Sequence, residues 1–209
     1  MLKASPNAGP LVLLLAATTV LFAALALWFF LSGQTPGDGS VEAGFARDMS
    51  VHHAQAVEMA EIARDKTESA EIRTLATDIA LTQQGQIGHM QGWLSVWRLP
   101  PTGPEPPMAW MGHPTEGRMP GMASPEEIRR LQEASPGEAD RLFLQLMIPH
   151  HQAAIPMAEA ALERTDNPQV TDLAEGIIAA QRGEIRVMND LLEERGAEAP
   201  TGSHGGHEH

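Results

Sequence analysis

The chain has 209 residues, a formal net charge of −13 and no cysteine or tyrosine. This length allows one or two modest domains. The lack of thiols excludes disulfides, thiolate zinc sites and cysteine catalysis. The excess of 27 acidic over 14 basic residues argues against a nucleic-acid partner, whose phosphates would be repelled.

Residues 11–31 form an uncharged apolar run interrupted only by Thr18 and Thr19. As a helix, this run would extend about 31 Å, which matches the hydrocarbon thickness of a bilayer. A cleaved signal peptide is the alternative, but its apolar core is normally shorter and followed by small residues, whereas this run ends in WFFL. We therefore predict an N-terminal transmembrane helix within residues 1–33. Lys3 places the N-terminus in the cytoplasm and the rest of the chain outside; cleavage would make the protein secreted.

An internal repeat with an offset of 98 residues follows this segment. FARDMSVHHAQAVEMAEIA, which begins at Phe45, aligns without gaps with FLQLMIPHHQAAIPMAEAA, which begins at Phe143. The offset continues from Leu75 and Leu173 to Met90 and Met188. One register held over so many positions indicates a duplicated two-helix unit.

Apolar residues in both copies recur at three- and four-residue steps, which is typical of amphipathic helices. Helix starts are marked by a cap at Ser124, a capping box at Ser135 and Glu138, and Asn167 before a proline. We predict long helices over 41–66, 69–98, 136–164 and 168–195, with hairpin turns near 67–68 and 165–167. The chain is therefore predicted to be all-α, an antiparallel four-helix bundle preceded by the transmembrane helix. Its parts are a first hairpin (34–98), a Met/Pro/Gly-rich crossover connector with a short helix (99–134), a second hairpin (135–197) and a His-rich tail (198–209).

Each copy carries a Met-x-x-His-His motif followed six residues later by a second methionine. Methionine can simply fill core gaps, with one histidine buried beside a hydrogen-bond partner. However, leucine or isoleucine would supply apolar volume without an imidazole that must be satisfied. Thioether and neutral imidazole form a soft ligand set that suits Cu(I) or Ag(I). The candidate metal ligands are His52, His53, Met49, Met59, Met90, His150, His151, Met147, Met157 and Met188.

Helix pairing suggests partners for these ligands. Antiparallel packing about the turn at 67–68 places Gln83 level with His52, and the equivalent pairing places Gln181 level with His151. We expect the two glutamines to hydrogen-bond and orient the imidazoles. Met59 is too far along its helix to share an ion with His52, so it would coordinate with another helix or at a separate subsite.

The connector and the tail contain further soft ligands. Their predicted role is auxiliary metal capture by flexible chain, although a plain spacer and an inert end are the alternatives. The residues concerned are Met108, Met111, His113, Met119 and Met122 in the connector, and His204, His207 and His209 in the tail.

The sequence MIPHHQAAIPMAEAAL followed by IIAAQRGEIRVM resembles the bacterial family known as domain of unknown function 305. The resemblance covers residues 41–195 and both copies of the motif. It implies a ferritin-like four-helix bundle, export from the cytoplasm and, as in some members, copper binding at the His-His/Met positions. The first copy departs from the pattern, with MSVHH in place of MIPHH and Glu58 where the second copy has Pro156.

Three classes of function remain open. A ferritin-like metal-dependent oxidase would need Glu-x-x-His motifs, and the sequence contains none. A structural or partner-binding bundle would use the histidines as core residues or a pH sensor. We expect instead an extracytoplasmic protein, not an enzyme, that stores, scavenges or chaperones Cu(I). A metal donor or acceptor protein and a second copy of the chain are its potential partners.

Overall fold

The computed structural model describes residues 8–32 and 35–196, and within these ranges every regular element is a helix and none is a strand. The chain divides after Pro36 into two compact units. The first unit contains α1 (Ala8–Ser32), and the second contains all the other helices. The prediction of an all-α chain is confirmed.

Helix α1 covers the predicted anchor. It has 25 residues, and its residues 12–28 are all exposed. Among the residues that the structure describes, no helix meets the combined length and apolarity that crossing a membrane requires. The transmembrane helix therefore stays a prediction.

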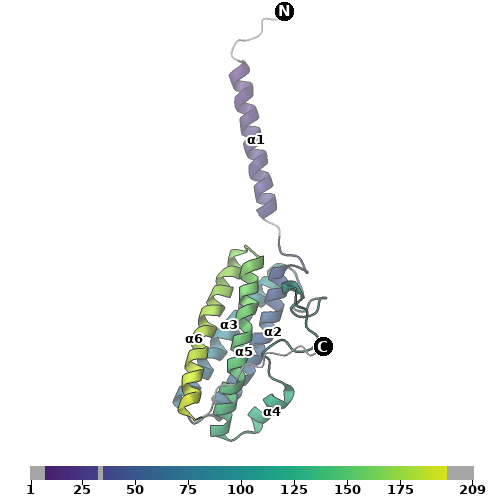
Figure 1. The fold of residues 1–209 in the computed structure, drawn as a ribbon. Helices are drawn as coiled ribbons and strands as arrows, with labels where there is room; N and C mark the ends of the chain where they lie inside the picture. The colour runs from purple at the N-terminus through teal and green to yellow at the C-terminus, as the bar shows by residue number, and fades with distance from the viewer. Residues whose placement is uncertain (1–7, 33–34, 197–209) are drawn as a thin grey trace, which may run out of the picture. The chain divides into compact units, whose positions relative to one another are not determined.

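The second unit is a helical bundle. Its long helices are α2 (Val41–Lys66), α3 (Ala70–Val96), α5 (Pro136–Arg164) and α6 (Pro168–Glu194), which lie side by side (Figure 1). Helix α2 packs on α3, α5 packs on α6, and the contact between α2 and α5 joins the two hairpins. The short elements η1 (Ala109–Met111) and α4 (Pro125–Glu133) both pack on α2 and α5. Every long helix begins and ends within two residues of its predicted bounds.

Local side-chain chemistry explains most of the helix starts. The hydroxyls of Ser40 and Ser69 accept backbone N–H groups of the first turns of α2 and α3, and Ser124 and Glu127 form a reciprocal capping box on α4. The capping box predicted at Ser135 is wrong, because this side chain makes no cap hydrogen bond. Helix α5 still begins there, since Pro136 at its first position already has the helical φ.

The connector packs on the bundle, so the prediction of flexible chain is wrong for the described part of it. The Asp48 carboxylate on α2 accepts the Met108 N–H at 2.6 Å and the Trp110 indole N–H at 2.8 Å. Two turns on, the Gln55 amide donates to the Ala123 carbonyl at 3.0 Å and accepts the Ala123 N–H at 2.7 Å. These polar anchors hold an irregular segment that has no apolar period of its own.

Replacing Asp48 with alanine is expected to detach the connector around Trp110. The substitution leaves two donors without their acceptor, so we expect a loss of about 2–3 kcal/mol in the free energy of unfolding. Urea unfolding gives this value, and tryptic cleavage after Arg118 should accelerate. Asp78→Ala, an exposed change on α3, is the control and should stay within about 0.5 kcal/mol. Equal stabilities for the two variants would contradict the role of Asp48.

Candidate metal centre

The four motif histidines lie in the interior of the bundle. His52 and His53 on α2 and His150 and His151 on α5 are all fully buried. The ring centroids of His52 and His150 are 3.8 Å apart, and the ring planes are tilted by 37°. Because these two residues are equivalent in the repeat, their contact lies at the pseudo-twofold axis that relates the hairpins.

Helix spacing brings the rings to this axis. One turn beyond His52 and His150 stand Ala56 and Ala154, which are fully buried and equivalent in the repeat. These small side chains let the backbones of α2 and α5 approach closely. The imidazoles therefore occupy the interface between the hairpins rather than an external face.

Most of the ring nitrogens lack hydrogen-bond partners. His52 donates its Nε2–H to the Pro120 carbonyl at 3.3 Å, and His151 donates its Nε2–H to the Glu184 carboxylate at 2.7 Å. Within the described part of the chain, no hydrogen bond of normal distance and angle is made by Nδ1 of His52, by Nδ1 of His151, or by either nitrogen of His53 and His150. Looser polar contacts reach His53 from Gln86 and His150 from the His52 backbone. A buried polar atom without a partner costs about 1–3 kcal/mol, so a concentration of six in one core calls for an explanation by function.

The hydrogen bond of His52 fixes its tautomer. A neutral imidazole that donates from Nε2 carries a lone pair on Nδ1. His52 therefore presents an unprotonated Nδ1 to the interior. A carboxylate behind a histidine, as Glu184 stands behind His151, is also the arrangement that orients metal-ligating imidazoles in proteins.

Burial keeps three of the four motif histidines uncharged. Desolvation lowers the pKa of His52 to about 4, although the Pro120 carbonyl opposes the shift. Desolvation, together with the neighbouring His52, lowers the pKa of His53 to about 3 and holds that of His150 well below its ordinary value. At neutral pH these rings are in the neutral form that coordinates metal ions.

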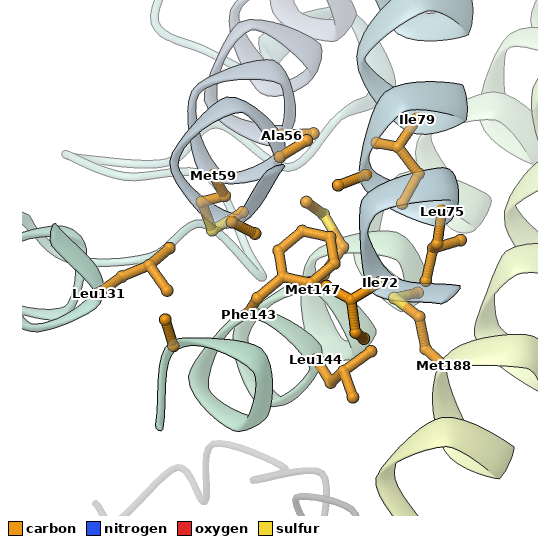
Figure 2. Close-up of a cluster of buried hydrophobic side chains, with 14 of the residues drawn as sticks. Ala56, Met59, Ile72, Leu75, Ile79, Leu131, Phe143, Leu144, Met147 and Met188 are labelled. Carbon is orange, nitrogen blue, oxygen red and sulfur yellow. The ribbon is translucent and has the colours of Figure 1, made fainter. Parts of the chain in front are cut away.

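The predicted methionines flank the histidines in two groups, and all of them are fully buried. The first group consists of Met59 from α2, Met147 from α5 and Met188 from α6. Their side chains meet in one core cluster, which also contains Phe143 (Figure 2). The second group lies in the other core cluster and consists of the repeat equivalents, Met157, Met49 and Met90. Each group thus combines methionines from both hairpins.

The connector enlarges the second methionine group. Met108, Met111 and Met119 are buried in the same cluster as Met49, and Met122 packs against it. His113 is exposed, and His204, His207 and His209 lie outside the described residues. Three of the residues assigned to flexible capture are therefore part of the core, because the connector docks through Asp48 and Gln55.

The two glutamines are buried but do not bind the histidines. Gln83 and Gln181 are 1% and 2% exposed, and both amide atoms of Gln83 and Oε1 of Gln181 have no partner in the described chain. The partner that His151 uses is Glu184, one turn beyond Gln181. The repeat equivalent of Glu184 is Gln86. Its polar contact with His53 opposes part of the lowering of the His53 pKa. His151 therefore pairs with a residue of α6 about one helical turn beyond the predicted one.

Nitrogen and oxygen ligands do not gather in large groups. Within residues 8–32 and 35–196, no three or more His, Cys, Asp or Glu side chains form a group that could hold a metal ion. The buried methionines of the two core clusters supply thioether sulfur as a further type of donor. Thioether ligands select soft ions such as Cu(I) and disfavour Mg²⁺, Ca²⁺ and Mn²⁺.

Comparison with known proteins identifies a family that matches the bundle. A family model described as Domain of unknown function (DUF305) matches residues 42–192. Protein L153 of Acanthamoeba polyphaga mimivirus is uncharacterized and is 45% identical over 56 residues, which are 27% of this chain and 37% of that protein.

Solved structures are similar over most of the chain. A DUF305 protein of Streptomyces coelicolor, whose description proposes that it is secreted, is 47% identical with a TM-score of 0.76, over 79% of this chain and 100% of that one. CopM in its Cu(II)-bound form is 30% identical with a TM-score of 0.60, over 74% of this chain and 97% of that one. Structures of CopM with Cu(I) and with Ag are similar to this chain as well.

Proposed function

The chain belongs to the DUF305 family, and from this premise we propose that it binds Cu(I), or Ag(I), inside its helical bundle. The metal is cargo that the protein stores, scavenges or delivers. The observation that carries the proposal is the set of six unpartnered imidazole nitrogens between two groups of buried methionines. The similarity to CopM, which has been solved with Cu(I), Cu(II) and Ag, supports the same class of ligand.

Energetics favour a metal-binding interior over a purely structural one. Each unpartnered nitrogen destabilises the metal-free fold, whereas coordination of an ion would use the lone pairs and release that penalty. Cu(I) fits better than Cu(II), because every sulfur donor is a thioether and the carboxylate Glu184 stands behind an imidazole rather than among the methionines.

A competition assay tests the proposal. Purified full-length protein should retain Cu(I) against an equimolar chromophoric Cu(I) chelator under reducing, anaerobic conditions, with at least about one ion per chain. Zn²⁺, which prefers nitrogen, oxygen and thiolate ligands, should be lost on gel filtration. Complete transfer of Cu(I) to the chelator would show that the proposal is wrong.

Paired methionine substitutions separate the two groups. We expect Met147→Leu/Met188→Leu and Met49→Leu/Met90→Leu each to lower the Cu–S signal in X-ray absorption and the bound copper. Because leucine nearly conserves volume, each change should alter stability by less than about 1.5 kcal/mol. Ile148→Leu, in the same core as Met147, is the control and should leave the copper content unchanged. Full copper and sulfur signals in both double variants would contradict thioether coordination.

We also propose that α1 anchors the bundle outside the cytoplasm. The support is the uncharged run within α1, whose large apolar side chains from Val12 to Trp28 are exposed, and the similarity to the Streptomyces protein. Alkaline carbonate extraction should leave the protein in the membrane fraction, and the N-terminal mass should include residues 1–33. A mature N-terminus after residue 31 would indicate a cleaved segment.

A further inference from the structure

An open groove of about 1080 Å³ runs between α3 and α6. Leu75 and Asp78 line it from α3, and Glu184 lines it from α6. Other lining positions on α6 are small, namely Ala179, Ala180 and Gly183, and this lack of side-chain volume leaves the space open. The groove brings solvent to the outer side of the helix that carries the partner of His151.

Glu184 links this groove to the buried histidines. Its side chain is 18% exposed, and its carboxylate lies 2.7 Å from Nε2 of His151, which is fully buried. On the other side of the same ring, Nδ1 is buried without a partner. One carboxylate therefore separates the solvent in the groove from an imidazole whose free nitrogen faces the core.

Charge makes the groove attractive to cations. Four acidic residues line it, and Arg186 is the single basic residue in its lining. A cleft lined mainly by one sign of charge raises the local concentration of the opposite ion. The repeat equivalent of Glu184 is the neutral Gln86, which does not line this groove, so the pseudo-symmetric bundle has its acidic link on one side only.

We propose that soft metal ions reach and leave the histidine centre through the groove between α3 and α6, with Glu184 passing the ion between the groove and His151. This inference rests on the proposed function. Carboxylate oxygen is a poor ligand for Cu(I), so an ion at Glu184 is held weakly and moves on to imidazole nitrogen and thioether sulfur. As the ion binds Nε2 of His151, the proton of that nitrogen leaves on the Glu184 carboxylate, and rotation of Glu184 into the groove releases this proton to solvent.

A matched pair of glycine variants tests the route without touching a ligand. A Cβ at Gly183 meets only the end of the Arg186 side chain, at 4.0 Å, and a Cβ at the repeat equivalent Gly85 meets nothing within 4 Å. Both leucine variants gain the same helix propensity, but only Gly183→Leu fills the groove. The measurement is the rate at which Cu(I)-loaded full-length protein releases metal to an excess of chromophoric Cu(I) chelator.

We expect Gly183→Leu to slow release at least tenfold and to leave the equilibrium copper content unchanged, while Gly85→Leu behaves as the wild type. Glu184→Gln should also slow release, and because Glu184 orients His151 it should lower the bound copper as well. Release from Gly183→Leu at the rate of Gly85→Leu overturns the route. A wild-type protein that retains no Cu(I) at all would instead refute the proposed function, so the two failures are distinguishable.

Discussion

Replacing His52 and His150 together with leucine is expected to abolish tight Cu(I) binding and, at the same time, to raise the stability of the metal-free protein. The two changes remove three buried nitrogens that have no hydrogen-bond partner, each costing about 1–3 kcal/mol. They also remove the hydrogen bond from His52 to Pro120 and the ring contact, which offset part of the gain. We expect a net stabilisation of about 1–3 kcal/mol and a loss of copper affinity of at least 100-fold.

Thermal unfolding with a chelator present and competition for Cu(I) measure the two effects. His89→Leu, an exposed change on α3, is the control and should alter neither. If the histidines were ordinary core residues, the double variant would lose stability and show the wild type's copper behaviour. That result would favour a structural or partner-binding bundle over the proposed function.

The helices and the burial of the histidines could be predicted because both follow from an apolar periodicity that occurs in both copies of the repeat. The duplicated motif fixes which face of α2 and α5 is apolar, and His52 and His150 lie on that face with Ala56 and Ala154. Serine and asparagine caps limit the helix ends to within a residue or two. The repeat also explains why equivalent rings meet at an axis.

The partner of His151 could not be predicted from the turn length. Antiparallel pairing from a hairpin turn is uncertain by about one helical turn, which is the difference between Gln181 and Glu184. Which side chain crosses to the imidazole depends on the rotation of α6 about its own axis, and packing in three dimensions decides this. The available signal was that Glu184 and its equivalent Gln86 are both polar and lie one turn beyond the conserved glutamine of each copy.

Differences between the two copies mark where the connector docks. The anchor Gln55 is matched by Ala153 in the second copy, and a Cβ on Gly121 of the connector would lie 2.6 Å from the Ala153 Cβ. The anchor Asp48 is matched by Leu146, which partly packs on the other core. Gln55 on α2 and the small residue Ala153 on α5 therefore face the same segment of the connector. Divergence within a repeat is thus informative about what binds each copy.

Lowering the pH from 7 to 5 is expected to destabilise the metal-free protein by several kcal/mol. Burial places the folded-state pKa of His52 at about 4 and that of His53 at about 3, and it also lowers the pKa of His150, whereas an unfolded histidine titrates near 6.5. Below pH 6.5 the unfolded chain therefore binds protons that the folded chain excludes. Stability is complete above that pH and falls as the pH drops toward the folded-state values, with each histidine contributing up to about 1.4 kcal/mol per pH unit.

Urea unfolding between pH 7.5 and 5 checks this dependence, and the slope should shrink markedly in His52→Leu/His150→Leu, since two of the three histidines are gone. Carboxylates do not imitate the effect in this window. The lowered pKa of Glu127 acts only below its ordinary value of 4.5, and the raised pKa of Asp48 has the opposite sign. Equal slopes in the two proteins would mean that the histidines titrate normally in the fold. Cu(I) should restore the stability lost at pH 5 to the wild type alone, because an ion that binds only the folded chain stabilises it by mass action.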